Sequence, residues 1–265
     1  MIRTIGVCTG ESDSQRNAQD HALELARLFG ARLRVVGVWS GRTSFDPGSD
    51  DSPETMIQAK MRQLKETFGA SGVAVDDYYR GEGREQALKA AARENDLLIL
   101  GLDTTEHSAS GTGVLTRSTA DLEIIGTAEC SVLAVRHAPQ SIRKILVHYQ
   151  IGLEGKQALR LAGAWGEKQN AAVIALSVQS DAAHAAVWTE TATRYLKGYD
   201  LPAVHTRFAS GNPESEGDLL NLAKEQEADA LVVGAKPYGL LDRLLDRDVA
   251  VDIARITRLP LLVAR

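Results

Sequence analysis

The chain repeats itself once, and this repeat constrains its fold more than any other feature. At an offset of 140 residues, "RTIGV" matches "RKILV" and "ARLRVVGV" matches "AAVIALSV". Two more matches follow in the same order: "AARENDLLILG" with "AKEQEADALVVG", and "SVLAVR" with "PLLVAR". The period is far longer than that of a solenoid repeat, so each copy is expected to be a domain in itself. We therefore predict domains at 1–138 and 143–265, joined by the polar linker "HAPQSI".

Within each copy, runs of β-branched and aliphatic residues alternate with segments of helical period. Unalternating strands separated by helices indicate a parallel sheet that is covered on both faces. In the first copy the strands are predicted at 3–8, 32–39, 73–79, 96–101 and 131–136. Each copy is therefore predicted to be an α/β domain with a five-stranded parallel sheet between helices.

Helix ends also carry sequence signals. A helix predicted over about 14–29 has Gly30 after it as a left-handed cap, and Asn170 takes that place in the second copy. Another helix is predicted to open with Ser52 as N-cap and Pro53 in its first turn. The apolar stripe of the first of these helices is formed by Ala18, Ala22, Leu25 and Phe29.

The last strand of each copy is short and apolar, which is typical of a sheet edge that invites a partner. If 131–136 pairs with 260–264 about a pseudo-twofold axis, each strand covers the other. We therefore predict an internal pseudo-dimer, and leave open whether two chains associate further.

Composition excludes several classes of partner. The 30 basic and 35 acidic side chains are spread evenly and give a net charge of −5, so no extended positive field favours nucleic acid or an anionic membrane. No stretch approaches the roughly 18 apolar residues of a membrane helix, and the N-terminus lacks the apolar core of an export signal. Cys8 and Cys130 lie far apart in apolar runs and are expected to be core residues rather than a disulfide. A cytoplasmic protein is expected.

The order of these segments, closing on "GTAECSVLAVR", resembles the universal stress protein family. The resemblance covers essentially the whole chain, once per copy, through "HALELARLFGARLRVVGV" and "ALKAAARENDLLILG" in the first half and "LLNLAKEQEADALVVG" and "ITRLPLLVAR" in the second. It implies two tandem flavodoxin-like or Rossmann-like domains of the adenine nucleotide alpha hydrolase type. It also implies dimer formation through the last strand and, in many members, ATP held after the fourth strand.

The nucleotide-binding pattern of that family is G-x2-G-x9-G followed by Ser or Thr, with an acidic residue at the end of the first strand. Glycines let backbone N–H groups approach phosphate, and a helix N-terminus favours an anion. In the first copy Gly101 matches the opening glycine and Thr119 the hydroxyl position, whereas Thr104 and Ser118 replace the other glycines. The intervening loop is four residues longer than the pattern allows.

The acid position of the first copy holds Gly10, with Glu11 beside it as a substitute. The loop "SASGTGVLTRST" would form a nest of N–H groups ahead of a helix that begins near Ser118. The alternative is a polar loop in which Ser118 or Thr119 only caps that helix. The candidate residues for binding ATP are therefore Gly101, Gly111, Gly113, Ser118 and Thr119.

The second copy keeps the spacing of the pattern but lacks the residue types that suit phosphate. Gly234 opens it, but Pro237 replaces the second glycine, Arg247 and Asp248 replace the final pair, and Gln150 stands at the acid position. Proline removes a backbone donor, and the carboxylate would repel phosphate oxygens. No nucleotide is expected in this half.

Other constellations are weaker. The histidines lack metal-ligand spacing, so no metal ligand is assigned. His107 beside Glu106 lacks a third orienting group, so no catalytic residue is assigned either. The acidic clusters at 46–51 and 75–79 are interpreted as solvated segments rather than cation sites.

His148 and Tyr149 end the first strand of the second copy, where open α/β sheets bind ligands. With Lys236 and Tyr238 they would line a pocket for a ligand other than ATP; the alternative is packing at the edge of the core.

Three functions remain open at this point. The first is a tandem universal stress protein with a binding or regulatory role during stress, with little or no catalytic turnover and a degenerate ATP motif in both halves. The second is an ATP-binding member that uses the loop over 101–119 for slow hydrolysis or self-phosphorylation. A scaffold that contacts another protein through its surface is a third.

Overall fold

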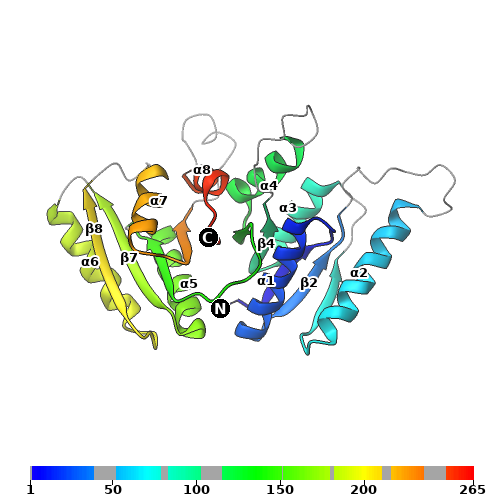
Figure 1. The fold of residues 1–265 in the computed structure, drawn as a ribbon, viewed down its shortest axis with the longest axis horizontal. Coiled ribbons are helices and arrows are strands. Elements are labelled where there is room, and N and C mark those ends of the chain that lie inside the picture. The colour runs from blue at the N-terminus through cyan, green and yellow to red at the C-terminus, as the bar shows by residue number, and fades with distance from the viewer. Residues whose placement is uncertain are drawn as a thin grey trace. The chain divides into compact units, whose positions relative to one another are not determined.

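The structure is a computed structural model that describes residues 2–38, 52–78, 83–102, 115–150, 152–179, 182–210, 216–235 and 249–265. Strands and helices alternate along the chain, as the sequence predicts, and they form two compact units (Figure 1). The first unit comprises Met1–Ile124, Ala128–Cys130 and Val135–Pro139. The second comprises Ile125–Thr127, Ser131–Ala134 and Gln140–Arg265.

In the first unit the strands lie in the order β3-β2-β1-β4, and all of their pairings are parallel. Their bounds are β1 Thr4–Cys8, β2 Arg32–Val36, β3 Val75–Tyr78 and β4 Leu97–Gly101. Because β1 lies between β2 and β4, the strand order reverses there. In open α/β sheets, ligands bind at the carboxyl ends of the strands beside such a switch point.

Helices connect these parallel strands and pack against the sheet. α1 packs on β1 and β4, and α2 packs on β2 and β3 (Figure 1). The helices are α1 Asp13–Phe29, α2 Pro53–Gly69, α3 Arg84–Glu94 and α4 Leu115–Thr127.

The predicted helix ends are confirmed. Gly30 and Asn170 adopt left-handed backbone with φ of 63° and 52°. The Ser52 hydroxyl accepts the Thr55 N–H at 3.2 Å. One stripe residue differs from the prediction: Ala18, Ala22 and Leu25 are buried, but Phe29 is only partly buried, because it is the last residue of α1 and Ala26 takes the core position of that turn.

In the second unit the strand order is β5-β10-β9-β6-β7-β8. The strands are β5 Ser131–Val135, β6 Lys144–His148, β7 Ala172–Gln179, β8 Val204–Ser210, β9 Ala230–Gly234 and β10 Leu261–Ala264. The helices are α5 Leu153–Gln169, α6 Ala182–Leu196, α7 Glu216–Glu225 and α8 Val249–Ile256. β6 lies between β7 and β9, so this unit repeats the switch point of the first.

Seven residues that belong to the first copy by sequence, Ile125–Thr127 and Ser131–Ala134, lie in the second unit. Ser131–Ala134 of β5 pair antiparallel with β10, with Leu133 opposite Leu262. The Ser131 hydroxyl accepts the Arg265 N–H at 3.1 Å. The structure thus contains the pairing of terminal strands that the sequence predicts.

Burial agrees with strands that are covered on both faces. Every residue of β4 and β5 is buried. Cys8 and Cys130 are both buried, which confirms their assignment to the core. Among the helices that the structure describes, none combines the length and the apolar character needed to cross a bilayer.

Candidate functional site

The candidate site of the first unit lies at the carboxyl ends of β1 and β4. Thr9 follows β1, and its own hydrogen bonds hold the strand end: its N–H donates to the Val36 carbonyl at 2.9 Å, and its hydroxyl accepts the Val38 N–H at 3.1 Å. Thr9 is buried. The backbone at this end of the sheet is therefore tied to β2.

Two buried glutamines of α1 reach into the same region. The Gln19 amide donates to the carbonyls of Cys8 and Gly10, both at 3.2 Å, and the Gln15 amide lies 3.5 Å from the Gly101 carbonyl. A Cβ on residue 10 would lie 2.7 Å from Gln15 Cγ. An acidic side chain at position 10 therefore conflicts with Gln15 as it stands, which gives the missing acid a structural cause.

Glu11, the substitute acid, is engaged elsewhere. Its carboxylate pairs with Lys60 of α2 at 2.9 Å, and its side chain is 72% exposed. Its carbonyl accepts the Arg16 guanidinium at 2.6 Å. A surface ion pair of this kind contributes little to stability. The Glu11 carboxylate remains largely exposed to solvent.

Gly101, the opening glycine of the motif, packs against the first turn of α1. A Cβ added to it would lie 1.9 Å from the carbonyl oxygen of Ser14 and 3.0 Å from the Gln15 nitrogen. Only glycine fits here, because backbone atoms of a packed helix cannot move aside without displacing the helix. The family motif assigns this glycine to phosphate, and sequence spacing alone does not reveal its packing role.

The end of the motif differs from the prediction in one respect. α4 begins at Leu115, not near Ser118. Leu115, Thr116 and Arg117 tolerate helical backbone, and the nearest poor helix former before them is Gly113. The unpaired N–H groups of a helix lie in its first turn. Thr119 lies after that turn.

The remaining candidates of the first copy cannot be placed. Gly111 and Gly113 lie outside the described residues, as do Glu106 and His107. Only the backbone of Ser118 and Thr119 is described. Their assignment to an ATP site stays a prediction.

The second unit reproduces the glycine packing of the first. A Cβ on Gly234 would lie 2.4 Å from the carbonyl oxygen of Glu154 in α5. Gly155, also in α5, is packed as closely: a Cβ on it would lie 1.7 Å from the carbonyl oxygen of Gln150, which follows β6. Pro237, Arg247 and Asp248 lie outside the described residues.

His148 and Tyr149 are both buried. The Tyr149 ring meets the Trp188 ring edge-on, with centroids 6.1 Å apart. Burial lowers the pKa of His148 to about 4, and its Nε2 has no hydrogen-bond partner among the residues described. Their surroundings agree with packing at the edge of the core; Lys236 and Tyr238 lie outside the described residues.

A buried ion pair in the first unit was not predicted. Arg84 of α3 donates to one carboxylate oxygen of Asp121 in α4 through Nε at 3.1 Å and Nη2 at 2.8 Å. Burial raises the pKa of the Cys8 thiol to about 11, and the charge of Arg84 partly opposes this rise. Cys8 is therefore a thiol at neutral pH. No sequence spacing links Arg84 to Asp121, since they lie on different helices.

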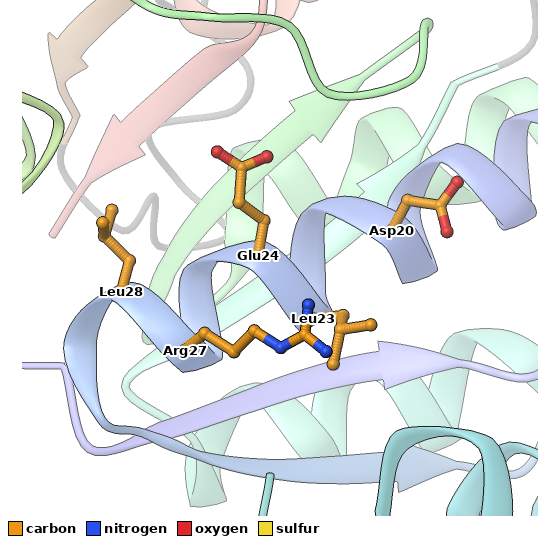
Figure 2. Close-up of a pocket in the computed structure, with 5 residues that line it drawn as sticks. All are labelled: Asp20, Leu23, Glu24, Arg27 and Leu28. Carbon is orange, nitrogen blue, oxygen red and sulfur yellow. The ribbon is translucent and has the colours of Figure 1, made fainter. Parts of the chain in front are cut away.

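Two surface hollows lie away from the strand ends. One lies on α1, whose Asp20 and Glu24 carboxylates point to one side while Arg27 extends along the helix (Figure 2). The other lies over α2 and β3, where Lys65 pairs with Asp77 at 2.9 Å. Asp76 is likewise paired, with Arg32 at 2.9 Å, so the acidic residues of β3 form ion pairs in the structure. The cluster at 46–51 lies outside the described residues.

Repeated switch points and repeated glycine packing define a tandem doubly wound α/β protein. The model of the universal stress protein family matches residues 1–136 and again 141–265. The chain therefore belongs to the universal stress protein family, in its tandem form.

Solved structures share this fold along the whole chain. A universal stress protein from Archaeoglobus fulgidus DSM 4304 matches with a TM-score of 0.74 at 15% identity, over 99% of this chain and 96% of that one. A functionally unknown protein from Pseudomonas aeruginosa PAO1 matches with a TM-score of 0.65 at 15% identity, over 99% and 92%. The cytoplasmic domain of a prokaryotic cation chloride cotransporter matches with a TM-score of 0.56 at 14% identity, over 100% and 95%. A comparison with curated protein sequences found no match.

Proposed function

We propose that this tandem universal stress protein has a binding or regulatory role in the stress response that does not depend on ATP held in the family motif. The observation that carries the proposal is the packing of Gly101 against the backbone of Ser14. Because this packing alone requires glycine, the retention of Gly101 is no sign of phosphate binding. The same holds for Gly234 against Glu154.

The strand ends of the first unit support the same conclusion. Gln15 and Gln19 direct their amides to backbone carbonyls at the strand ends, and a side chain at position 10 would displace the Gln15 side chain. A buried amide that already donates to acceptors within the protein gains little by donating to a ligand. A ligand in this place would have to displace the amide. Thr9, likewise, uses its hydroxyl within the protein.

The second half is the weaker candidate for ATP on chemical grounds. Pro237 offers no N–H, and Asp248 adds a negative charge where the motif needs donors. We infer that this half contributes surface and stability to the chain instead of a nucleotide site.

The terminal strands bear on how the protein assembles. Antiparallel pairing of β5 with β10 supports an internal pseudo-dimer, in which the chain makes within itself the strand contact that the family resemblance implies between two chains. Its two cysteines, which form no disulfide with each other, support a cytoplasmic location.

The test is the melting temperature of the purified full chain, measured with and without Mg²⁺ and ATP. A ligand that binds only the folded state raises the melting temperature as its concentration rises. We expect no rise up to millimolar ATP. A saturable rise that is lost in Thr119→Val would reject the proposal and favour the ATP-binding function of the loop over 101–119.

A further inference from the structure

We propose that β8 pairs antiparallel with β8 of a second copy of this chain, about a twofold axis at Thr206. The contact goes beyond the proposed function, since it makes a dimer through an edge other than the terminal strands. The length of this edge, the direction of its backbone groups and its self-complementary order of residues favour the contact.

β8 ends the strand order of the second unit, and its outer edge pairs with no strand in the part of the chain that the structure describes. Figure 1 shows α6 alongside β7 and β8 at this edge. β8 has seven residues, whereas β3, which ends the order of the first unit, has four and carries Asp76 and Asp77. Short edges and charged side chains resist pairing; β8 is longer than β3 and carries one charged residue, Arg207, where β3 carries two.

The ladder with β7 fixes which backbone groups of β8 point outward. The Val173 N–H donates to the Ala203 carbonyl at 3.0 Å, and Val173 lies opposite Val204. In a parallel ladder the groups then alternate, so those of His205 and Arg207 face β7. Val204, Thr206 and Phe208 consequently direct their N–H and C=O groups away from the sheet.

A twofold axis at Thr206 joins these outward groups to their own copies. Thr206 then lies opposite Thr206 of the second copy, and Val204 lies opposite Phe208 on either side. All of these are hydrogen-bonded pairs of an antiparallel ladder, which gives about six main-chain hydrogen bonds. The Val204 side chain would also cover Phe208, which is 39% exposed.

Other registers are poorer. An axis at Arg207 would place Arg207 directly opposite its own copy, and like charges at this distance destabilise a strand pair. An axis at His205 would place Phe208 opposite Pro202, which has no N–H to donate. The order of residues in β8 therefore favours one register.

Engineered cysteines test that register in the full chain. Hydrogen-bonded antiparallel pairs have Cα atoms about 5.5 Å apart, within the range that a disulfide spans. Thr206→Cys should give a covalent dimer on mild oxidation, read on a non-reducing gel and by mass. Val204→Cys alone should not, because the two copies of residue 204 would lie about 13 Å apart. Val204→Cys combined with Phe208→Cys should restore the covalent dimer; the native Cys8 and Cys130 are buried.

Sedimentation without cross-linking provides the second measurement. The wild-type chain should dimerise reversibly, and Thr206→Pro, which removes the N–H at the axis, should raise the dissociation constant at least tenfold. Val187→Lys on α6, where the side chain is 57% exposed, is the matched control and should leave it unchanged. A chain that stays monomeric at about 1 mM, or Val204→Cys that cross-links as well as Thr206→Cys, would overturn the proposal. A monomer whose β8 binds an extended peptide would likewise overturn it and assign the edge to another protein.

Discussion

At the scale of single residues, two glycines join the sequence motif to the packing of the fold. Gly101 and Gly234 end equivalent strands, and each lies against the first turn of the helix that follows the first strand of its copy. Their backbone approaches the helix more closely than any side chain allows. A residue type that a ligand motif requires is thus also required by the scaffold.

Gly101→Ala should therefore destabilise the chain in the absence of any nucleotide. Forcing a methyl group against helix backbone typically costs about 1 to 3 kcal/mol, and contact with backbone atoms places this site at the upper end. Urea denaturation measures the change. Gly69→Ala is the control, since a Cβ there meets nothing within 4 Å. Equal stability of the two variants would show that Gly101 is not needed for packing.

His148 should make stability depend on pH. Its folded pKa of about 4 lies below the ordinary value of 6.5, so between these values the unfolded chain binds a proton that the folded chain does not. Stability is therefore unaffected by His148 at pH 7 and falls as the pH drops through 6.5 toward 4, by up to about 3 kcal/mol. His21 acts in the same direction, because burial lowers its pKa too.

His148→Leu removes this titration. The difference in unfolding free energy between this variant and the wild type should grow as the pH falls from 7 to 4, because the variant lacks the proton uptake. At neutral pH the two should be similar, since the Nε2 of His148 has no partner among the described residues. Parallel pH profiles for the two proteins would show that His148 is not buried as described.

At the scale of elements, most helix ends follow from local signals that can be recognised in the sequence. Ser52 before Pro53, Gly30 and Asn170 mark helix ends through backbone chemistry that needs no tertiary contact. α4 is the exception: Ser118 is a good N-cap by type, but nothing in Leu115–Arg117 prevents the helix from starting earlier. A cap residue inside a permissive segment does not fix a helix start.

The pairing of β5 with β10 makes a residue of the first copy part of the core of the second unit. Leu133 lies opposite Leu262 and is buried, so Leu133→Ala should cost about 2 to 5 kcal/mol. The loss should appear as faster hydrogen exchange in β10. Leu97→Ala in β4 is the control, and its effect should fall on the first unit. Unchanged exchange in β10 of Leu133→Ala would contradict the pairing.

At the scale of the whole molecule, the repeat in the sequence anticipates the repeated fold because each copy carries its own apolar strands and helical stripes. The site is less predictable. The contact of Gln15 with Gly10 and the ion pair of Arg84 with Asp121 join residues that no sequence motif links. Both depend on how the helices pack in the folded unit. Sequence alone therefore located the strand ends of the candidate site but not the side-chain contacts around them.

We propose that both halves keep the fold of a nucleotide site but bind no nucleotide there. A native mass spectrum of the full chain, purified without added nucleotide, is the test. We predict the mass of the polypeptide alone. A stoichiometric adenine nucleotide carried through purification would contradict the account.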